Sequence, residues 1–149
     1  MAIEYVLRTA LERHIISTRR HFTDVVQDIR AEIDARASAG GPADRLAMAR
    51  CPEAGPDRAA ALAPGVSRLV RLVLDRPSTT AELARTLPDV GLYCPVSILV
   101  QQITDGGTRL SYDSVAGAIA VHQDEAATAV AQSFDAEILA LLRRVADRD

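Results

Sequence analysis

The segment that most constrains the fold is residues 91–113, with the sequence GLYCPVSILVQQITDGGTRLSYD. Its first half is apolar and rich in β-branched residues, and its end alternates between polar and apolar side chains. Between them lies the run Asp105 to Gly107, a composition that supplies the positive φ angles of a tight hairpin turn. We therefore predict two antiparallel strands, from Pro95 to Ile103 and from Thr108 to Tyr112.

The N-terminal part of the chain predicts a strand followed by a helix. Several β-branched residues favour a strand between Val6 and Arg20. Apolar residues then recur at helical spacing from Phe22 to Ile33, with Thr23 or Asp24 as the helix N-cap. The run Gly40 to Pro42 should end this helix.

The middle of the chain, residues 36–65, gives the weakest pattern. Arg45 to Cys51 favours a short strand, and Ala54 to Leu62 favours a short helix or a loop; a flexible insertion is the alternative for this stretch. The next run, Val66 to Leu74, fits a helix face by its spacing. Its length, its valines and the flanking Gly and Pro residues favour a buried strand instead.

The remaining segments predict helices. Thr79 and Glu82 match a capping box, which opens a helix that stops before Pro88. Asp124 can cap the last helix, in which apolar residues recur every three or four positions from Ala127 to Val145. Because helices and strands are interspersed and one strand pair forms a tight hairpin, we predict an α+β fold. One domain over residues 1–149 would then have helices packed on a single, mostly antiparallel sheet.

Composition excludes several classes of function. The formal net charge is −3, which argues against a nucleic-acid or membrane-surface partner, because clustered positive charge holds both. All 17 basic residues are Arg, a bias typical of a GC-rich bacterial genome. Two cysteines are too few for a disulfide scaffold, and neither a signal peptide nor a membrane span is evident. We expect a cytoplasmic protein with reduced thiols.

The sequence contains few candidate residues for catalysis or metal binding. None of the three histidines has the spacing of a metal site, so we expect neither a metal ion nor a cofactor. Cys94, at the start of a core strand, is expected to be a small buried apolar residue. The glycines of the hairpin turn are not a phosphate-binding loop, because no helix with Lys and Ser or Thr follows them.

Four residues remain as weak candidates for a site. His21, Tyr112 and Asp113 could act as general acids or bases, and Tyr93 and Tyr112 could line a ligand pocket between the sheet and the helices. Each has a structural alternative. Asp113 could cap a helix running to about Val121, His21 could make a surface contact at a helix start, and both tyrosines could pack in the core.

The segment from about Val66 to the C-terminus resembles the bacterial domain-of-unknown-function family 302. The resemblance rests on Leu74 to Pro77, on Gly91 to Val100, on the Asp105 to Gly107 turn and on Ser111 to Asp113. The chain departs from the family pattern in two places. No His of the family's Asp-His pair is present near Cys51-Pro52, and Asp75 to Pro77 replaces a Gly-Asn-Pro turn.

The resemblance implies a compact α+β domain with helices on one sheet, and often a dimer; it implies no chemistry. If the altered family residues form a ligand site, this chain has lost or changed it. Our first hypothesis is therefore a small domain that binds a small ligand or a protein partner as a homodimer. The alternative is a small bacterial enzyme that acts on an apolar or aromatic substrate by acid–base catalysis, and a purely structural subunit is a third.

Overall fold

The fold is built on one antiparallel sheet of five strands in the order β1-β5-β4-β3-β2. We describe it from a computed structural model, and the description is of residues 1–38, 45–49, 65–104 and 106–148. The strands are β1 (Arg13–Thr18), β2 (Arg45–Ala49), β3 (Val66–Asp75), β4 (Val96–Ile103) and β5 (Thr108–Asp113). Both strands of the predicted hairpin are confirmed, as are the strands predicted before and after the uncertain middle segment. The helix or loop predicted from Ala54 to Leu62 lies outside the described residues.

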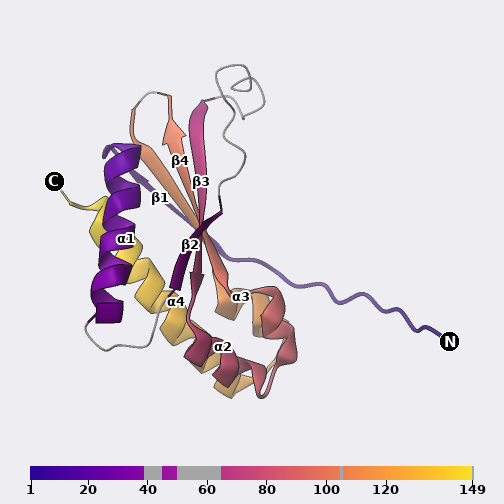
Figure 1. The fold of residues 1–149 in the computed structure, drawn as a ribbon. Coiled ribbons are helices and arrows are strands. Elements are labelled where there is room, and N and C mark those ends of the chain that lie inside the picture. Colours follow the sequence, from indigo (N-terminus) through magenta and orange to yellow (C-terminus); the bar gives the residue numbers. More distant parts are fainter. Residues whose placement is uncertain (39–44, 50–64, 105, 149) are drawn as a thin grey trace.

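Helices lie on one side of this sheet and at one of its ends (Figure 1). The long helices α1 (Phe22–Ser38) and α4 (Glu125–Ala146) contact each other. The short helices α2 (Pro77–Ala84) and α3 (Val115–Ile119), with the 3₁₀ turns η2 (Pro88–Leu92) and η3 (Ala120–His122), also contact one another or α4. The predicted α+β class with helices packed on an antiparallel sheet is confirmed. No described helix is long and apolar enough to cross a membrane.

The core lies between the sheet and the helices α1 and α4. Alternate side chains of the central strands point into it and are fully buried, among them Leu72, Ile98, Val100 and Leu110. They meet the apolar stripes of the two long helices, whose fully buried members include Val25, Ile29, Ile138, Leu142 and Val145. Apolar side chains that recur every two residues in the strands and about every 3.6 residues in the helices thus meet at one interface.

The glycines of the β4–β5 turn adopt the backbone conformation that the sequence predicts. Gly106 has φ of +84° and Gly107 has φ of +115°, which side-chain-bearing residues rarely adopt. At Gly107 a side chain would also collide with the neighbouring loop, because an added Cβ would lie 2.7 Å from the carbonyl oxygen of Thr18. The turn is therefore packed against the end of β1.

Three predicted helix caps are wrong. Helix α1 begins at Phe22, so Thr23 and Asp24 lie inside its first turn. Helix α2 begins at Pro77, before the predicted capping box, because proline has the helical φ and needs no N–H partner at this position.

The third incorrect cap is at α3, where Ser114 rather than Asp113 is the N-cap and its side chain accepts a hydrogen bond from the Gly117 N–H. The strand β5 continues through Asp113, so the helix starts one residue later. The cap predicted for the last helix is confirmed, since Asp124 accepts a hydrogen bond from the Ala127 N–H.

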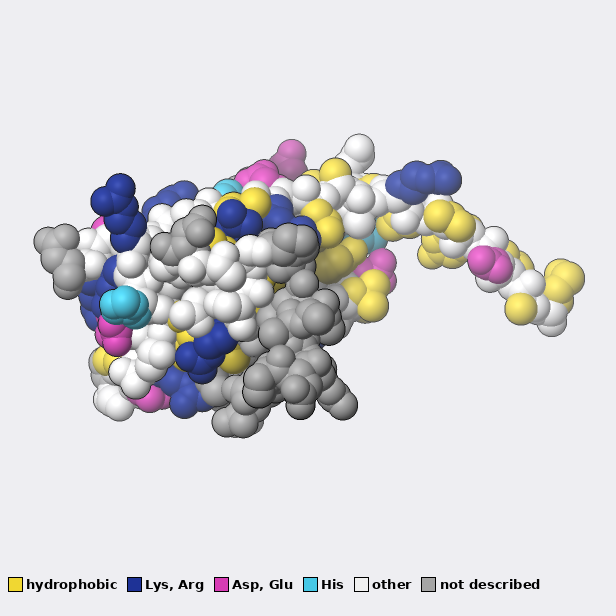
Figure 2. All heavy atoms as spheres, turned by 90° about the horizontal axis from the view of Figure 1, so that it is seen from above, with side chains coloured by type: hydrophobic (Ala, Val, Ile, Leu, Met, Phe, Trp, Pro, Cys, Tyr) yellow, Lys and Arg dark blue, Asp and Glu magenta, His cyan; other side chains and the backbone are white. Residues whose placement is uncertain are grey.

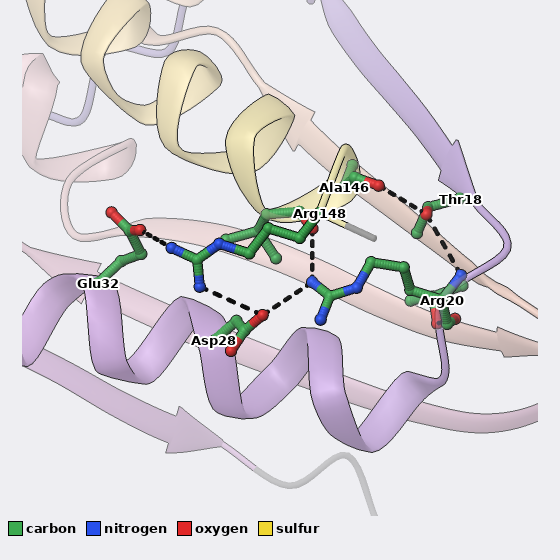
Figure 3. A network of polar contacts seen from close by, with 8 residues as sticks. Thr18, Arg20, Asp28, Glu32, Ala146 and Arg148 are labelled. Carbon is green, nitrogen blue, oxygen red and sulfur yellow. Dashed lines mark hydrogen bonds and ion pairs between the residues drawn. The ribbon is translucent and has the colours of Figure 1, made fainter.

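A polar network ties the end of α4 to α1 and to the loop after β1 (Figure 3). Arg20 donates a hydrogen bond to the Val145 carbonyl at 2.7 Å and pairs with Asp28 at 2.8 Å. Arg148 pairs with Asp28 and Glu32. Because these arginines lie at the C-terminal end of a helix, they also complement its partial negative charge.

Candidate functional site

The side of the sheet opposite α1 and α4 is the open face, and its side chains are exposed or half-buried. The pairing registers align Ile15, Ser111, Leu99 and Arg71 in one row across four strands. The next row includes Arg109 on β5 beside Gln101 on β4. This face is thus a mixed surface of apolar, hydroxyl and guanidinium groups, in contrast to the apolar core face.

A groove of about 600 Å³ runs over the open face. Its apolar walls come from the segment before β1, from the η2 turn and from the strands themselves, and they include Leu11, Ile15, Leu92, Tyr93, Pro95 and Leu99. Its polar walls include Arg13, Arg71, Gln101, Arg109, Ser111 and Asp113. The volume falls within the roughly 300–1,000 Å³ that is usual for small-molecule sites.

Some charged side chains of the groove are paired with an opposite charge and others are not. Asp113 forms a bidentate pair with Arg13, with distances of 2.7 and 2.9 Å between guanidinium nitrogens and carboxylate oxygens. The hydrogen bonds from Arg13 hold the pKa of the Asp113 carboxyl below its usual range. Arg71 hydrogen-bonds to the Ser97 hydroxyl at 2.8 Å. Among the described residues, neither Arg71 nor Arg109 has a carboxylate partner, so the groove keeps a positive character beside β4.

Tyr112 points to the other side of the sheet, into the core, where only 1% of it is exposed. Its hydroxyl donates a hydrogen bond of 2.6 Å to Asp135 on α4. Burial, followed by the neighbouring Asp135 charge, raises the pKa of Tyr112 far above its ordinary value. The phenol therefore stays protonated and serves as a donor inside the core.

Asp135 is a buried carboxylate that organises the start of α3. Besides the Tyr112 hydroxyl, it accepts hydrogen bonds from the Ser114 hydroxyl and from the backbone N–H groups of Val115 and Ala116, at 2.8 to 2.9 Å. These four donors replace the water that a carboxylate would otherwise bind. We interpret this cluster as a structural connection between β5, α3 and α4.

The structure does not bring the three acid–base candidates together. Tyr112 and Asp113 are neighbours on β5, so their side chains point to opposite faces of the sheet. His21 is exposed at the start of α1, just after Arg20, whose carbonyl accepts a hydrogen bond from Thr108 at the far end of β5. Four residues of strand, roughly 13 Å, separate Thr108 from Tyr112.

The two tyrosines proposed for ligand binding are also separated. Tyr93 is half-buried and lines the groove, whereas Tyr112 lies in the core. Cys94 is buried as expected, and burial raises the pKa of its thiol, which disfavours the reactive thiolate. Among the described residues, no group of three or more His, Cys, Asp or Glu side chains is arranged to hold a metal ion.

Two of the candidates, Tyr93 and Asp113, line the groove, but sequence reasoning missed its arginines and the buried Asp135. A signal for Asp135 does exist, because it follows Ala131 by four positions and precedes Ile138 by three, which places a carboxylate within the apolar stripe of α4. A buried charge at such a position needs local donors. For Arg71 and Arg109 no local signal exists, because only the pairing of β3, β4 and β5 places them around Leu99.

Comparison with known proteins identifies the family. The model of the domain of unknown function DUF302 matches residues 59–145, and no curated protein matches the chain. A crystal structure of an uncharacterized conserved DUF302 protein from Bacillus stearothermophilus is similar, with a TM-score of 0.65 and 15% sequence identity. The match covers 91% of this chain and 95% of that one, and at this identity it shows a shared fold only. Since the family model matches more than half of the sequence, the chain belongs to the DUF302 family.

Proposed function

We propose that this protein is a binding domain whose open-face groove holds a small ligand with an apolar body and an anionic group. The observation that carries the proposal is the groove itself, which combines apolar walls with two arginines that have no carboxylate partner among the described residues. Apolar walls bury a ligand's body, and a few placed polar groups orient it. Guanidinium groups suit carboxylate, sulfonate or phosphate groups.

In this proposal Arg71 and Arg109 bind one anion together. They flank β4 from its two neighbouring strands, on the same face as Leu99. Asp113 adds little repulsion, because Arg13 neutralises it. A ligand whose apolar part lies on Leu99 and Tyr93 would therefore have its anionic group within reach of both long side chains.

The test is a fluorescence titration with anilinonaphthalene sulfonate, which joins an aromatic body to an anion. We expect Arg71→Gln combined with Arg109→Gln to weaken binding by roughly tenfold or more, because a hydrogen bond to a charged group contributes about 1.5–3 kcal/mol. The matched control is Arg30→Gln combined with Arg85→Gln, an exposed residue of α1 and the exposed C-cap residue of α2, which do not line the groove. Equal binding by both double variants would show that the groove arginines do not hold the sulfonate.

Native mass spectrometry of protein purified from its own host gives a second measurement. A small anion that co-purifies with the wild-type protein, and not with the Arg71→Gln and Arg109→Gln double variant, would identify the ligand class. A ligand retained equally by both would lie elsewhere.

We propose further that the protein works as a homodimer. Support comes from the exposed apolar side chains Ile15 and Leu92 at the edge of the groove, which are 60% and 80% exposed. Both side chains line the same groove, and apolar surface grouped in this way is typical of an interaction site.

A further inference from the structure

Arg71, one of the two arginines of the proposed anion site, is held by a hydroxyl group. Its Nε–H donates a hydrogen bond to the Ser97 hydroxyl at 2.8 Å. Ser97 is half-buried on β4, whereas Arg71 is exposed on the neighbouring strand β3. Figure 2 shows arginine side chains at the surface of the body beside hydrophobic ones. An exposed guanidinium can exchange one hydrogen-bond partner for another without unpacking the core.

The strand registers show in which direction Ser97 draws Arg71. Arg71 is opposite Leu99 on β4, and Arg109 is opposite Gln101 on the same strand. Ser97 lies two residues before Leu99, and Gln101 lies two residues after it; all three line the groove. Four residues of strand, roughly 13 Å, thus separate Ser97 from Gln101. The hydrogen bond to Ser97 therefore draws the Arg71 guanidinium away from Arg109.

We propose that Ser97 determines the selectivity of the groove for anions, because it holds Arg71 away from the anion site until an anion displaces it. This inference rests on the proposed function, in which both arginines bind one anion. In the free protein the Arg71 guanidinium donates to Ser97. In the complex the guanidinium turns toward Arg109 and donates to the anion instead.

The exchange of partners favours an anion over a neutral ligand for two reasons. A carboxylate, sulfonate or phosphate accepts two parallel hydrogen bonds from a guanidinium and attracts its charge, whereas the Ser97 hydroxyl is one neutral acceptor. Movement of Arg71 toward Arg109 also brings two positive charges together, and an anion between them offsets this repulsion. A neutral polar group offers neither gain, so it leaves Arg71 on Ser97.

The bond to Ser97 lowers the affinity for the anion, because Arg71 must leave the hydroxyl before both arginines can bind. When only part of the protein is in the binding-competent state, the apparent affinity falls by that fraction. Loss of the Ser97 hydroxyl should therefore strengthen anion binding. A groove residue that contacted the ligand directly would have the opposite effect when truncated.

Titration of Ser97→Ala with anilinonaphthalene sulfonate tests the sign of this effect. We expect a dissociation constant roughly three- to tenfold lower than that of wild type, the range that corresponds to one hydrogen bond. Ser97→Thr keeps a hydroxyl group at this position and should bind like wild type. The matched control is Ser111→Ala, which removes another half-buried hydroxyl of the groove and should leave the dissociation constant unchanged.

Two further measurements separate the release of Arg71 from a change in groove shape. N-phenylnaphthylamine has the aromatic body of the first probe without its sulfonate, so Ser97→Ala should not alter its binding. In an Arg71→Gln background, Ser97→Ala should not alter sulfonate binding either, because the arginine that it would release is absent. Tighter binding of both probes, or a gain that persists with Arg71→Gln, would overturn the role proposed for Ser97.

Failure of this inference and failure of the proposed function give different results. If Arg71→Gln combined with Arg109→Gln weakens sulfonate binding, but Ser97→Ala binds the sulfonate as wild type does or less tightly, only the role of Ser97 is refuted. If the double arginine variant binds the sulfonate as tightly as wild type, both are refuted.

Discussion

The two faces of one sheet have opposite properties, although they are made from the same strands. Ile98 and Leu99 are neighbours on β4, yet Ile98 is fully buried against the helices and Leu99 lies on the groove. The same alternation separates Leu72 from Arg71 on β3. One face therefore forms the core, whereas the other lines the groove.

Polar groups differ between the faces in the same way. On the helix side, Asp135 is 6% exposed and has four protein donors. On the open face, the Arg13–Asp113 pair is in contact with water, with the two side chains 59% and 37% exposed. The first arrangement substitutes for solvent, whereas an exposed pair contributes little to stability.

The largest effect is expected from loss of the buried carboxylate. Asp135→Ala leaves four donors unpaired, including the Tyr112 hydroxyl, so we expect the free energy of unfolding to fall by about 3–5 kcal/mol. Urea denaturation followed by circular dichroism measures this change. Tyr112→Phe removes a single donor and should cost about 1–2 kcal/mol. A loss below that of Tyr112→Phe would mean that the cluster is not a structural connection.

A smaller effect should distinguish the faces directly. Ile98→Ala leaves a cavity in the core and should lower the free energy of unfolding by about 2–4 kcal/mol. Leu99→Ala, one residue away, should lower it by less than about 1 kcal/mol, because that side chain already contacts solvent. Both values come from the same denaturation experiment. Equal losses would show that the open face is covered in solution, for instance by a second copy.

The smallest effect concerns pH. The hydrogen bond from Arg20 lowers the pKa of Asp28 in the folded state. Ionised Asp28 therefore stabilises the fold fully above its unfolded pKa of about 4, and this stabilisation is lost as pH falls through the lower, folded pKa. Arg20→Ala should lose less stability than wild type on acidification from about pH 5 to pH 2, by about 1 kcal/mol at most. Thermal unfolding across this range measures the difference.

The matched variant for the pH experiment is Arg13→Ala on the open face. Its partner Asp113 also has a lowered pKa, but water screens this exposed pair. We expect the acid dependence of Arg13→Ala to stay closer to that of wild type than the acid dependence of Arg20→Ala. The opposite order would place the stronger electrostatic coupling on the open face.

Helix boundaries show where local patterns were insufficient. The predicted box at Thr79 and Glu82 is a valid start signal, but Pro77 opens the helix earlier because its φ is already helical. At Asp113 the competing influence is the pairing of β5 with β1 through the Arg13 register, which extends the strand. The position of a helix cap therefore depends on where the neighbouring strand or turn ends, and tertiary contacts decide this.

Sequence alone determined the α+β class, the β4–β5 hairpin and the core stripes of α1 and α4, because hydrophobic period and glycine conformations are local properties. The tertiary structure alone decided that the buried Tyr112 hydroxyl donates a hydrogen bond to Asp135. It also decided that Arg71 and Arg109 line the same groove. These contacts join residues more than twenty positions apart. Strand order and helix docking set such contacts, and no spacing along the chain encodes them.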